Sequence, residues 1–236
     1  MSSQFLSFII PIRAGEMAKG VYLSARGSLP ISTSLVWVLL DRFFDFWVVL
    51  LVVTITGVLI NQQVIASGAA LVLLGFSCGV FMAVISQSLV KRLATLTGPL
   101  KFFCLSIVEG FNLLKMPPKR WTVTLVLSFL ALLSDSIIWW SALWAVGVNL
   151  NPVQALFSTG LSALSFLIPA APGFIGSAEA SGLIILNYVL GLDANLASSG
   201  VVLNHLTTLI ILPIFGLIAL TQLKFNLSTV WKKLRA

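Results

Sequence analysis

Charged residues are scarce in this chain. Only 9% of its 236 residues are Asp, Glu, Lys or Arg, whereas 58% are hydrophobic, and the mean hydropathy is +1.07. Soluble domains carry about a quarter charged residues, so a water-soluble globular protein is excluded. We predict an all-α, polytopic transmembrane helical bundle that forms a single integral membrane domain over residues 1–236, because helices satisfy their own backbone polar groups in lipid.

Cysteine and histidine are also nearly absent. The two cysteines lie far apart, Cys78 in an apolar run and Cys104 in a basic segment, so we expect neither a disulfide nor a metal site. There is no Walker loop and no Ser/His/Asp arrangement, and no cofactor and no catalytic residue is predicted. The 14 basic residues give a net charge of +7, but they form no patch beside aromatics, so nucleic acid is not an expected partner.

Long apolar runs predict four spanning helices. They cover residues 35–60, 64–86, 121–147 and 196–222. Each is longer than the roughly 20 residues that cross a bilayer. In the second run, Gly68, Gly75 and Gly79 lie near helical spacing, so we expect them to allow close helix contact. Residues 100–114 mix apolar positions with Lys101 and Glu109, which predicts an interfacial helix on the cytoplasmic side.

The basic residues are distributed asymmetrically between the apolar runs. None of the 14 falls in the turns predicted at residues 61–63, 149–152 and 191–195. Cytoplasmic loops carry an excess of Lys and Arg. We therefore expect a multi-pass protein of the cell (inner) membrane with its basic connections and its C-terminus in the cytoplasm.

One apolar region is interrupted by prolines and glycines. Residues 165–182 read SFLIPAAPGFIGSAEASG, and a continuous membrane helix does not tolerate such a run without help from its neighbours. We expect residues 153–190 to form either a re-entrant pair or two short spans, and we favour the re-entrant pair because both arms are short. Residues 7–11, SFIIP, match residues 165–169, SFLIP, at four of five positions. Broken elements at about 5–20 and 153–190 therefore predict an inverted repeat around a transport site.

Several ionisable side chains fall within the predicted spans. A carboxylate at membrane depth costs about 2.5–3.5 kcal/mol and suggests a function by default. Asp135 lies near the centre of its span and is either functional or a buried hydrogen-bonding post between helices. Asp41 and Asp45 lie at i and i+4 beside Arg42, on one helix face. These three residues form either a functional group or a self-contained ion cluster.

Further candidates lie near the broken segments. Ser177 and Glu179 begin a helix, where the carboxylate complements the helix dipole or the backbone N–H groups bind a lipid phosphate. Arg13 is either a phosphate ligand, since guanidinium binds phosphate bidentately, or a snorkelling anchor. His205 is the only histidine, and we weigh a satisfied core residue against a proton relay.

Three motifs occur in a fixed order along the chain. Pro11-x-Arg13-x-Gly15-Glu16-x-x-Lys19 is followed by Asp41-Arg42-x-x-Asp45 and then by Pro172-Gly173-x-x-Gly176-x-x-Glu179. Over nearly the whole chain, this set resembles the lysylphosphatidylglycerol synthase transmembrane-region family. That family includes the flippase part of bacterial multiple peptide resistance factor and stand-alone proteins, some associated with glycosyltransferases that use polyprenyl-phosphate sugars.

The resemblance implies movement of a membrane lipid between leaflets, either an anionic phospholipid or a polyprenyl-phosphate-linked sugar. Relatives usually carry glutamate at the position of Asp41, a second glycine at that of Phe174 and an arginine about where His205 stands. They also usually have spans before the first motif, which predicts a truncated chain or a naturally short member. The predicted substrate-binding residues are Arg13, Glu16, Asp41, Arg42, Asp45, Asp135, Gly173, Gly176, Ser177, Glu179 and His205.

Two other functions stay open at this point. The chain could be a non-transporting scaffold that presents lipid to a glycosyltransferase or lipid synthase, docked through the basic residues 87–120. It could also be a membrane-embedded transferase that uses Asp135 and Glu179 as acid and base.

Overall fold

The computed structural model describes residues 31–85, 118–165 and 172–222, and every regular element in these ranges is helical. The elements are α3 (Ile31–Leu59), α4 (Gln63–Ile85), α7 (Pro118–Ala145), α8 (Pro152–Ser165), the 3₁₀ turn η2 (Pro172–Phe174), α9 (Ser177–Leu183), the π-helical turn η3 (Ile184–Val189) and α10 (Ala194–Gln222). The predicted all-α class is confirmed.

Three of these helices are long and apolar enough to cross a membrane. The apolar segments are Leu40–Leu59 on α3, Lys119–Ala145 on α7 and Ala194–Ile218 on α10. The fourth predicted span lies on α4, which adds a shorter apolar stretch, Gln63–Cys78. Large apolar side chains cover the outside of these helices, as at Leu71, which is 71% exposed. Such surfaces suit lipid tails, and the protein is a multi-pass membrane protein.

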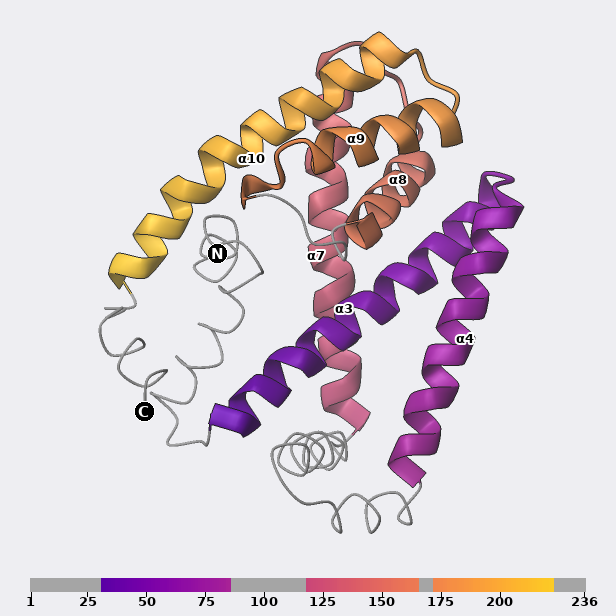
Figure 1. Cartoon of the computed structure of the whole chain (residues 1–236), viewed down its shortest axis with the longest axis vertical. Coiled ribbons are helices and arrows are strands. Elements are labelled where there is room, and N and C mark those ends of the chain that lie inside the picture. The colour runs from indigo at the N-terminus through magenta and orange to yellow at the C-terminus, as the bar shows by residue number, and fades with distance from the viewer. Residues whose placement is uncertain (1–30, 86–117, 166–171, 223–236) are drawn as a thin grey trace.

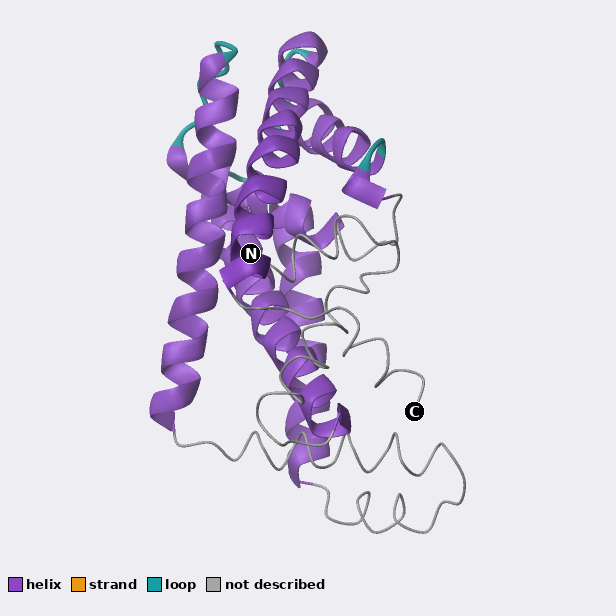
Figure 2. Ribbon diagram, turned by 90° about the vertical axis from the view of Figure 1, so that its left-hand side faces the viewer, coloured by secondary structure: helices purple, strands orange, loops and turns teal. Residues whose placement is uncertain are grey.

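The turns between the long helices gather at one end of the bundle, which we call the turn end (residues 60–62, 146–151 and 190–193). The Gln62 amide donates a hydrogen bond to the Val189 carbonyl at 2.8 Å. Val148 packs in one cluster with Leu190. Figure 2 draws these turns in teal, in the upper half of the view. They contain no basic residue.

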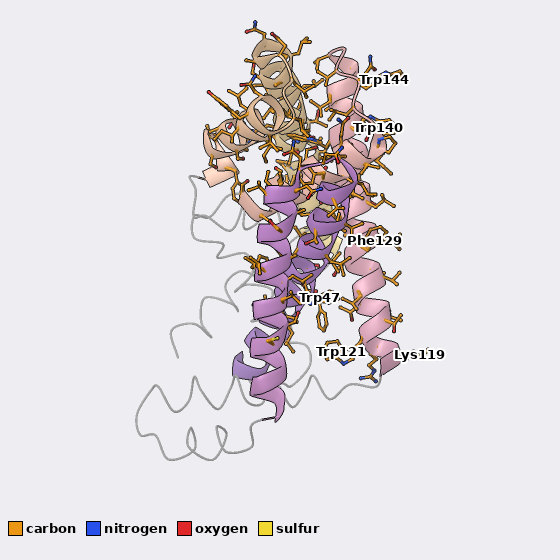
Figure 3. All side chains as sticks on the ribbon, turned by 90° about the vertical axis from the view of Figure 1, so that its right-hand side faces the viewer. Trp47, Lys119, Trp121, Phe129, Trp140 and Trp144 are labelled. Carbon is orange, nitrogen blue, oxygen red and sulfur yellow. The ribbon has the colours of Figure 1, made fainter. Side chains whose placement is uncertain are left out.

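Two described basic residues lie at the other end of α7. Lys119 and Arg120 are both exposed there, and we call this the basic end. Figure 3 shows Lys119 at the bottom of α7, with Trp140 and Trp144 near its top. Tryptophan is enriched where a helix meets the membrane surface, so the two ends of α7 differ as the two faces of a membrane do.

Helices α7 and α8 hold the bundle together. Helix α7 packs against α3, α8 and α10, while α8 packs against α3, α7 and α9. Figure 1 shows α7 at the centre, with α4 on its right and α10 on its left. Buried side chains such as Val53 and Phe157 fill the α3–α8 contact, and Leu143 and Val201 lie in a second cluster on α7 and α10.

The close helix contacts that the structure describes use other glycines than Gly68 and Gly75. A Cβ atom built on Gly68 or Gly75 would meet nothing within 4 Å, so the prediction of close contact is wrong for both positions. A Cβ on Gly160 would instead lie 2.7 Å from Val53 Cγ2, and one on Gly200 would lie 2.4 Å from Leu143 Cδ2. Gly68 and Gly75 therefore face outward from α4, whereas Gly160 and Gly200 face α3 and α7. The surroundings of Gly79 lie outside what the structure describes.

The broken segment has two short helical arms. Helix α8 has 14 residues and α9 only seven, so each is too short to cross a bilayer alone. Helix α8 begins, and η3 ends, at the turn end. The choice of a re-entrant pair stays a prediction. The segments predicted at residues 5–20 and 100–114 lie outside the described residues, so the inverted repeat and the interfacial helix stay predictions as well.

Trp139 links α7 to α8, which gives a test of this packing. Its indole Nε1 donates to the buried Ser158 hydroxyl at 3.0 Å. We expect Trp139→Phe to lower the free energy of unfolding by about 1 kcal/mol, the usual worth of one hydrogen bond. Thermal unfolding in detergent measures this loss. The control Trp144→Phe, at a side chain that is 71% exposed, should leave the midpoint unchanged, and equal losses would contradict the packing.

Candidate functional site

The broken segment contains a turn in which three residues adopt left-handed backbone angles. The φ angles are 70° at Gly173, 57° at Phe174 and 83° at Gly176. Glycine adopts such angles at no steric cost, but for a residue like Phe174 they cost roughly 1–2 kcal/mol. Strained backbone of this kind persists only when the surroundings hold it in place. The structure shows what holds this turn.

His205 on α10 joins the turn to α9. Its Nε2 donates to the Gly173 carbonyl oxygen at 2.8 Å, and its Nδ1 lies in hydrogen-bond contact with Glu179 Oε1. The second oxygen of Glu179, Oε2, accepts a hydrogen bond from the Gly176 N–H at 2.7 Å. We call these four residues the Glu179–His205 ring, because their hydrogen bonds and the backbone from Gly173 to Gly176 together form one closed circuit between the turn, α9 and α10.

The ring requires a definite number of protons. A carbonyl oxygen can only accept, so Nε2 of His205 carries one proton, and a second proton must lie between Nδ1 and the Glu179 carboxyl group. Burial raises the pKa of Glu179, but hydrogen bonds from His205, its own backbone N–H and Gly176 lower it by more. The pKa of Glu179 therefore falls below its ordinary value, which favours the ionised carboxylate.

The start of α9 is occupied by the chain itself. Glu179 Oε2 accepts the hydrogen bond of Gly176, and the exposed Ser177 donates its hydroxyl proton to the Phe174 carbonyl at 3.0 Å. A carboxylate in the first helical turn also complements the helix dipole. This favours the dipole alternative for Glu179 over a phosphate bound to the N–H groups of this helix start.

A second polar group lies where α3 meets α7. Arg42 Nη1 lies 3.2 Å from Asp45 Oδ2, and its Nη2 lies 3.9 Å from Asp41 Oδ2. The other oxygen of Asp45, Oδ1, accepts a hydrogen bond from the Ser128 hydroxyl on α7 at 2.7 Å. The expected ion cluster is therefore present, and it also ties α3 to α7. Its charged side chains are 36–43% exposed.

Asp135 lies on α7 two turns beyond Ser128. Residues seven apart lie on the same side of a helix, so Asp135 continues the side that carries Ser128. Asp135 is exposed, whereas Ser136 beside it is buried. The exposure argues against a buried post that ties two helices together.

His205 and Asp135 lie at a similar depth in the bundle. Helices α7 and α10 run antiparallel, since α7 ends and α10 begins at the turn end. A Cβ on Gly182 would touch both Val201 and Trp139, which places these two at one level. His205 follows Val201 by four residues, and Asp135 precedes Trp139 by four, so both lie one turn nearer the basic end.

The structure thus brings the predicted site residues into two groups. Gly173, Gly176, Glu179 and His205 form the ring, with Ser177 beside it, while Asp41, Arg42 and Asp45 form the ion cluster and Asp135 stands apart. Arg13 and Glu16 lie outside the described residues. Sequence reasoning missed Ser128, for which the only signal is a hydroxyl in an apolar span.

With this geometry in view, the chain can be compared with known proteins. The family model described as lysylphosphatidylglycerol synthase TM region matches residues 1–216. The chain belongs to this family. None of the curated proteins and none of the solved structures matches the chain. The resemblance inferred from the three ordered motifs is confirmed, and membership relates the chain to the handling of membrane lipid.

A substitution at Asp135 separates a functional role from a structural one. Because Asp135 is exposed on α7 and a neutral asparagine removes a charge from membrane depth, we expect Asp135→Asn not to lower the free energy of unfolding. Ser136→Val, at the buried neighbour, should destabilise the protein more. Thermal unfolding of both variants in detergent checks the expectation. A larger loss of stability in Asp135→Asn than in Ser136→Val would support the alternative that Asp135 is a buried hydrogen-bonding link between helices.

Proposed function

We propose that the protein moves a phospholipid or a polyprenyl-phosphate-linked sugar between the leaflets of the cell (inner) membrane, with its C-terminus in the cytoplasm. The observation that carries the proposal is the placing of charged side chains where apolar helices meet. The Glu179–His205 ring joins α9 to α10, and Asp45 joins α3 to α7 through Ser128. Charges at membrane depth are costly and mark pathways of polar substrates.

The polar side chains offer a lipid headgroup binding partners at successive depths in the membrane. In the proposal, the guanidinium groups of Arg13 and Arg42 bind the phosphate bidentately. Asp45 and Asp135 accept hydrogen bonds from hydroxyl groups of the glycerol or sugar. Ser128 and Asp135 are separated by about 10 Å along α7, so they offer successive partners at two depths. Glu16 and Asp41 would pair with basic residues while no lipid is bound.

The turn at Gly173–Gly176 supports the same proposal. Non-helical backbone at membrane depth is tolerated only inside protein or beside a water-filled cavity. Broken helices of this kind accompany substrate sites in transporters. The acyl chains would stay in the lipid beside the exposed apolar faces of α4 and α10, where Leu71 and Ile210 are 71% and 61% exposed.

Reconstitution into vesicles tests the proposal. The full chain is placed in vesicles with fluorescent phosphatidylglycerol, and exchange is followed by chemical quenching of the outer leaflet. We expect Arg13→Ala, Glu179→Ala and Ser128→Ala each to slow exchange by about tenfold, the effect of 1.4 kcal/mol on a barrier. Ser134→Ala is the matched control, because the exposed Ser134 bonds only its own helix, at Leu130 O.

Unchanged exchange in Arg13→Ala and Glu179→Ala would show that the site is wrongly assigned. Vesicles with no exchange above the protein-free rate would remove the translocase proposal altogether.

A second candidate function is a scaffold that presents lipid to a glycosyltransferase or lipid synthase. The exposed Lys119 and Arg120 at the basic end favour it, since they offer charge to a partner. Co-purification with such an enzyme, together with no exchange in vesicles, would support the scaffold. A membrane-embedded transferase gains less support, because both oxygens of Glu179 already accept hydrogen bonds within the ring.

A further inference from the structure

We propose that Glu179 and His205 form a proton-binding site, whose bound proton holds the Gly173–Gly176 turn closed against α10 and thereby makes lipid exchange depend on pH. The effect on exchange rests on the proposed function. The proton site itself rests on the hydrogen bonds of the ring alone.

The closed ring cannot form with one proton fewer. If the imidazole of His205 is neutral and Glu179 is ionised, one imidazole nitrogen has no proton. Either Nδ1 then faces a carboxylate oxygen or Nε2 faces the Gly173 carbonyl, and in both cases two acceptors meet. Because His205 and Gly173 are buried, an unmatched acceptor there costs about 1–3 kcal/mol. Raising the pH therefore weakens the closed state.

Few other titratable groups face this site among the described residues. Helix α8 carries none, and η3 carries only the exposed Tyr188. On α7, Asp135 lies at the depth of His205, whereas Lys119 and Arg120 lie at the basic end. On the described part of α10, His205 is the only ionisable side chain, and Asp193 lies just before that helix at the turn end.

Loss of the proton would free a strained segment. The left-handed angle at Phe174 stores strain that the ring restrains, and the π-helical turn Ile184–Val189 follows α9 directly. Turns of this type interrupt helices mostly at functional sites. Once His205 is neutral, the Glu179 carboxylate becomes available to hydroxyl or amine groups of a lipid headgroup. Exchange should then increase with pH, by about tenfold per pH unit for a one-proton step below its midpoint.

Nuclear magnetic resonance of the imidazole nitrogens tests the proton site without any transport. His205 is the only histidine, so ¹⁵N-labelled histidine reports on this residue alone when the full chain is purified through a tag without histidine. We expect both nitrogens to be protonated while the hydrogen bonds of the closed ring are present, and one proton to be lost when the pH is raised. In Glu179→Gln, the proton should be lost at lower pH, because the carboxylate that stabilises the cation is gone. A His205 imidazole that stays neutral at every pH measured would overturn the proposal.

Exchange in vesicles of phosphatidylcholine and phosphatidylglycerol tests the coupling. We expect the wild-type rate to rise as the pH is raised, because the closed ring loses its proton. His205→Arg should exchange lipid at a rate independent of pH, since guanidinium stays charged, and Tyr188→Phe should behave as wild type. A flat wild-type profile, or the same slope in His205→Arg, would overturn the coupling. A proton seen by resonance without exchange in any variant would remove the proposed function and leave the proton site established.

Discussion

Replacing His205 with alanine is expected to lower the free energy of unfolding by about 3 kcal/mol. The substitution leaves the buried Gly173 carbonyl without its donor and removes the partner of Glu179 Oε1. Leaving such polar groups unmatched costs about 1–3 kcal/mol each. It also empties a space at a side chain that is 8% exposed, and cavities add to the loss. On the scale of soluble domains of similar size, the midpoint should fall by roughly 10 °C.

Two further variants show whether the hydrogen bonds are the cause. His205→Gln keeps a side chain that can donate to one of the two acceptors, so it should recover part of the lost stability. Thr207→Ala is the matched control on the same helix, because the Thr207 hydroxyl bonds only Leu203 O of α10. Thermal unfolding in detergent compares the three. Equal midpoints for His205→Ala and Thr207→Ala would contradict the role assigned to the ring.

The helices themselves could be predicted well from the sequence. Apolar runs with few charges predicted spans at 35–60, 121–147 and 196–222, and the structure places α3, α7 and α10 there. The reason is physical: in lipid, each helix satisfies its own backbone, so its length follows from its own composition. The π-helical turn Ile184–Val189 was not predicted, because no residue pattern distinguishes it from a regular helix.

The helix contacts could not be predicted in the same way. Gly68 and Gly75 have the spacing of a contact face, but they point outward, whereas Gly160 and Gly200 bring their helices close to α3 and α7. Lipid tails are as apolar as leucine, so a membrane helix shows no strong difference between its lipid-facing and its protein-facing side. Glycine spacing therefore cannot decide which side of α4 meets another helix.

The candidate site was predicted as residues, without their pairing. Asp41, Arg42 and Asp45 lie within one turn of the chain, so their cluster could be expected from spacing. Glu179 and His205 are 26 residues apart, and their contact depends on how α9 and α10 are turned towards each other. No local sequence pattern predicts the angle at which α9 and α10 are turned towards each other. The same holds for Ser128, whose partner Asp45 lies 83 residues earlier.

The packing that fixes this angle can be broken at Gly182. A Cβ there would lie 2.8 Å from both methyl groups of Val201 and 3.3 Å from Trp139 Cη2. Valine is stiff about χ1, and Val201 is buried, so neither methyl group can move aside. We expect Gly182→Val to cost about 3 kcal/mol, at the upper end for an overfilled core. Thermal unfolding in detergent measures the loss.

Gly75→Val is the matched control, because a side chain at Gly75 would meet nothing within 4 Å and should leave the unfolding midpoint unchanged. A second consequence belongs to Gly182→Val alone. Glu179 lies one turn before Gly182, and His205 lies one turn after Val201, so separating α9 from α10 also pulls the carboxylate from the imidazole. The ¹⁵N resonances should then show that the His205 imidazole loses its second proton at lower pH than in wild type. A stable Gly182→Val protein with an unchanged resonance would show that the contact between α9 and α10 does not position the ring.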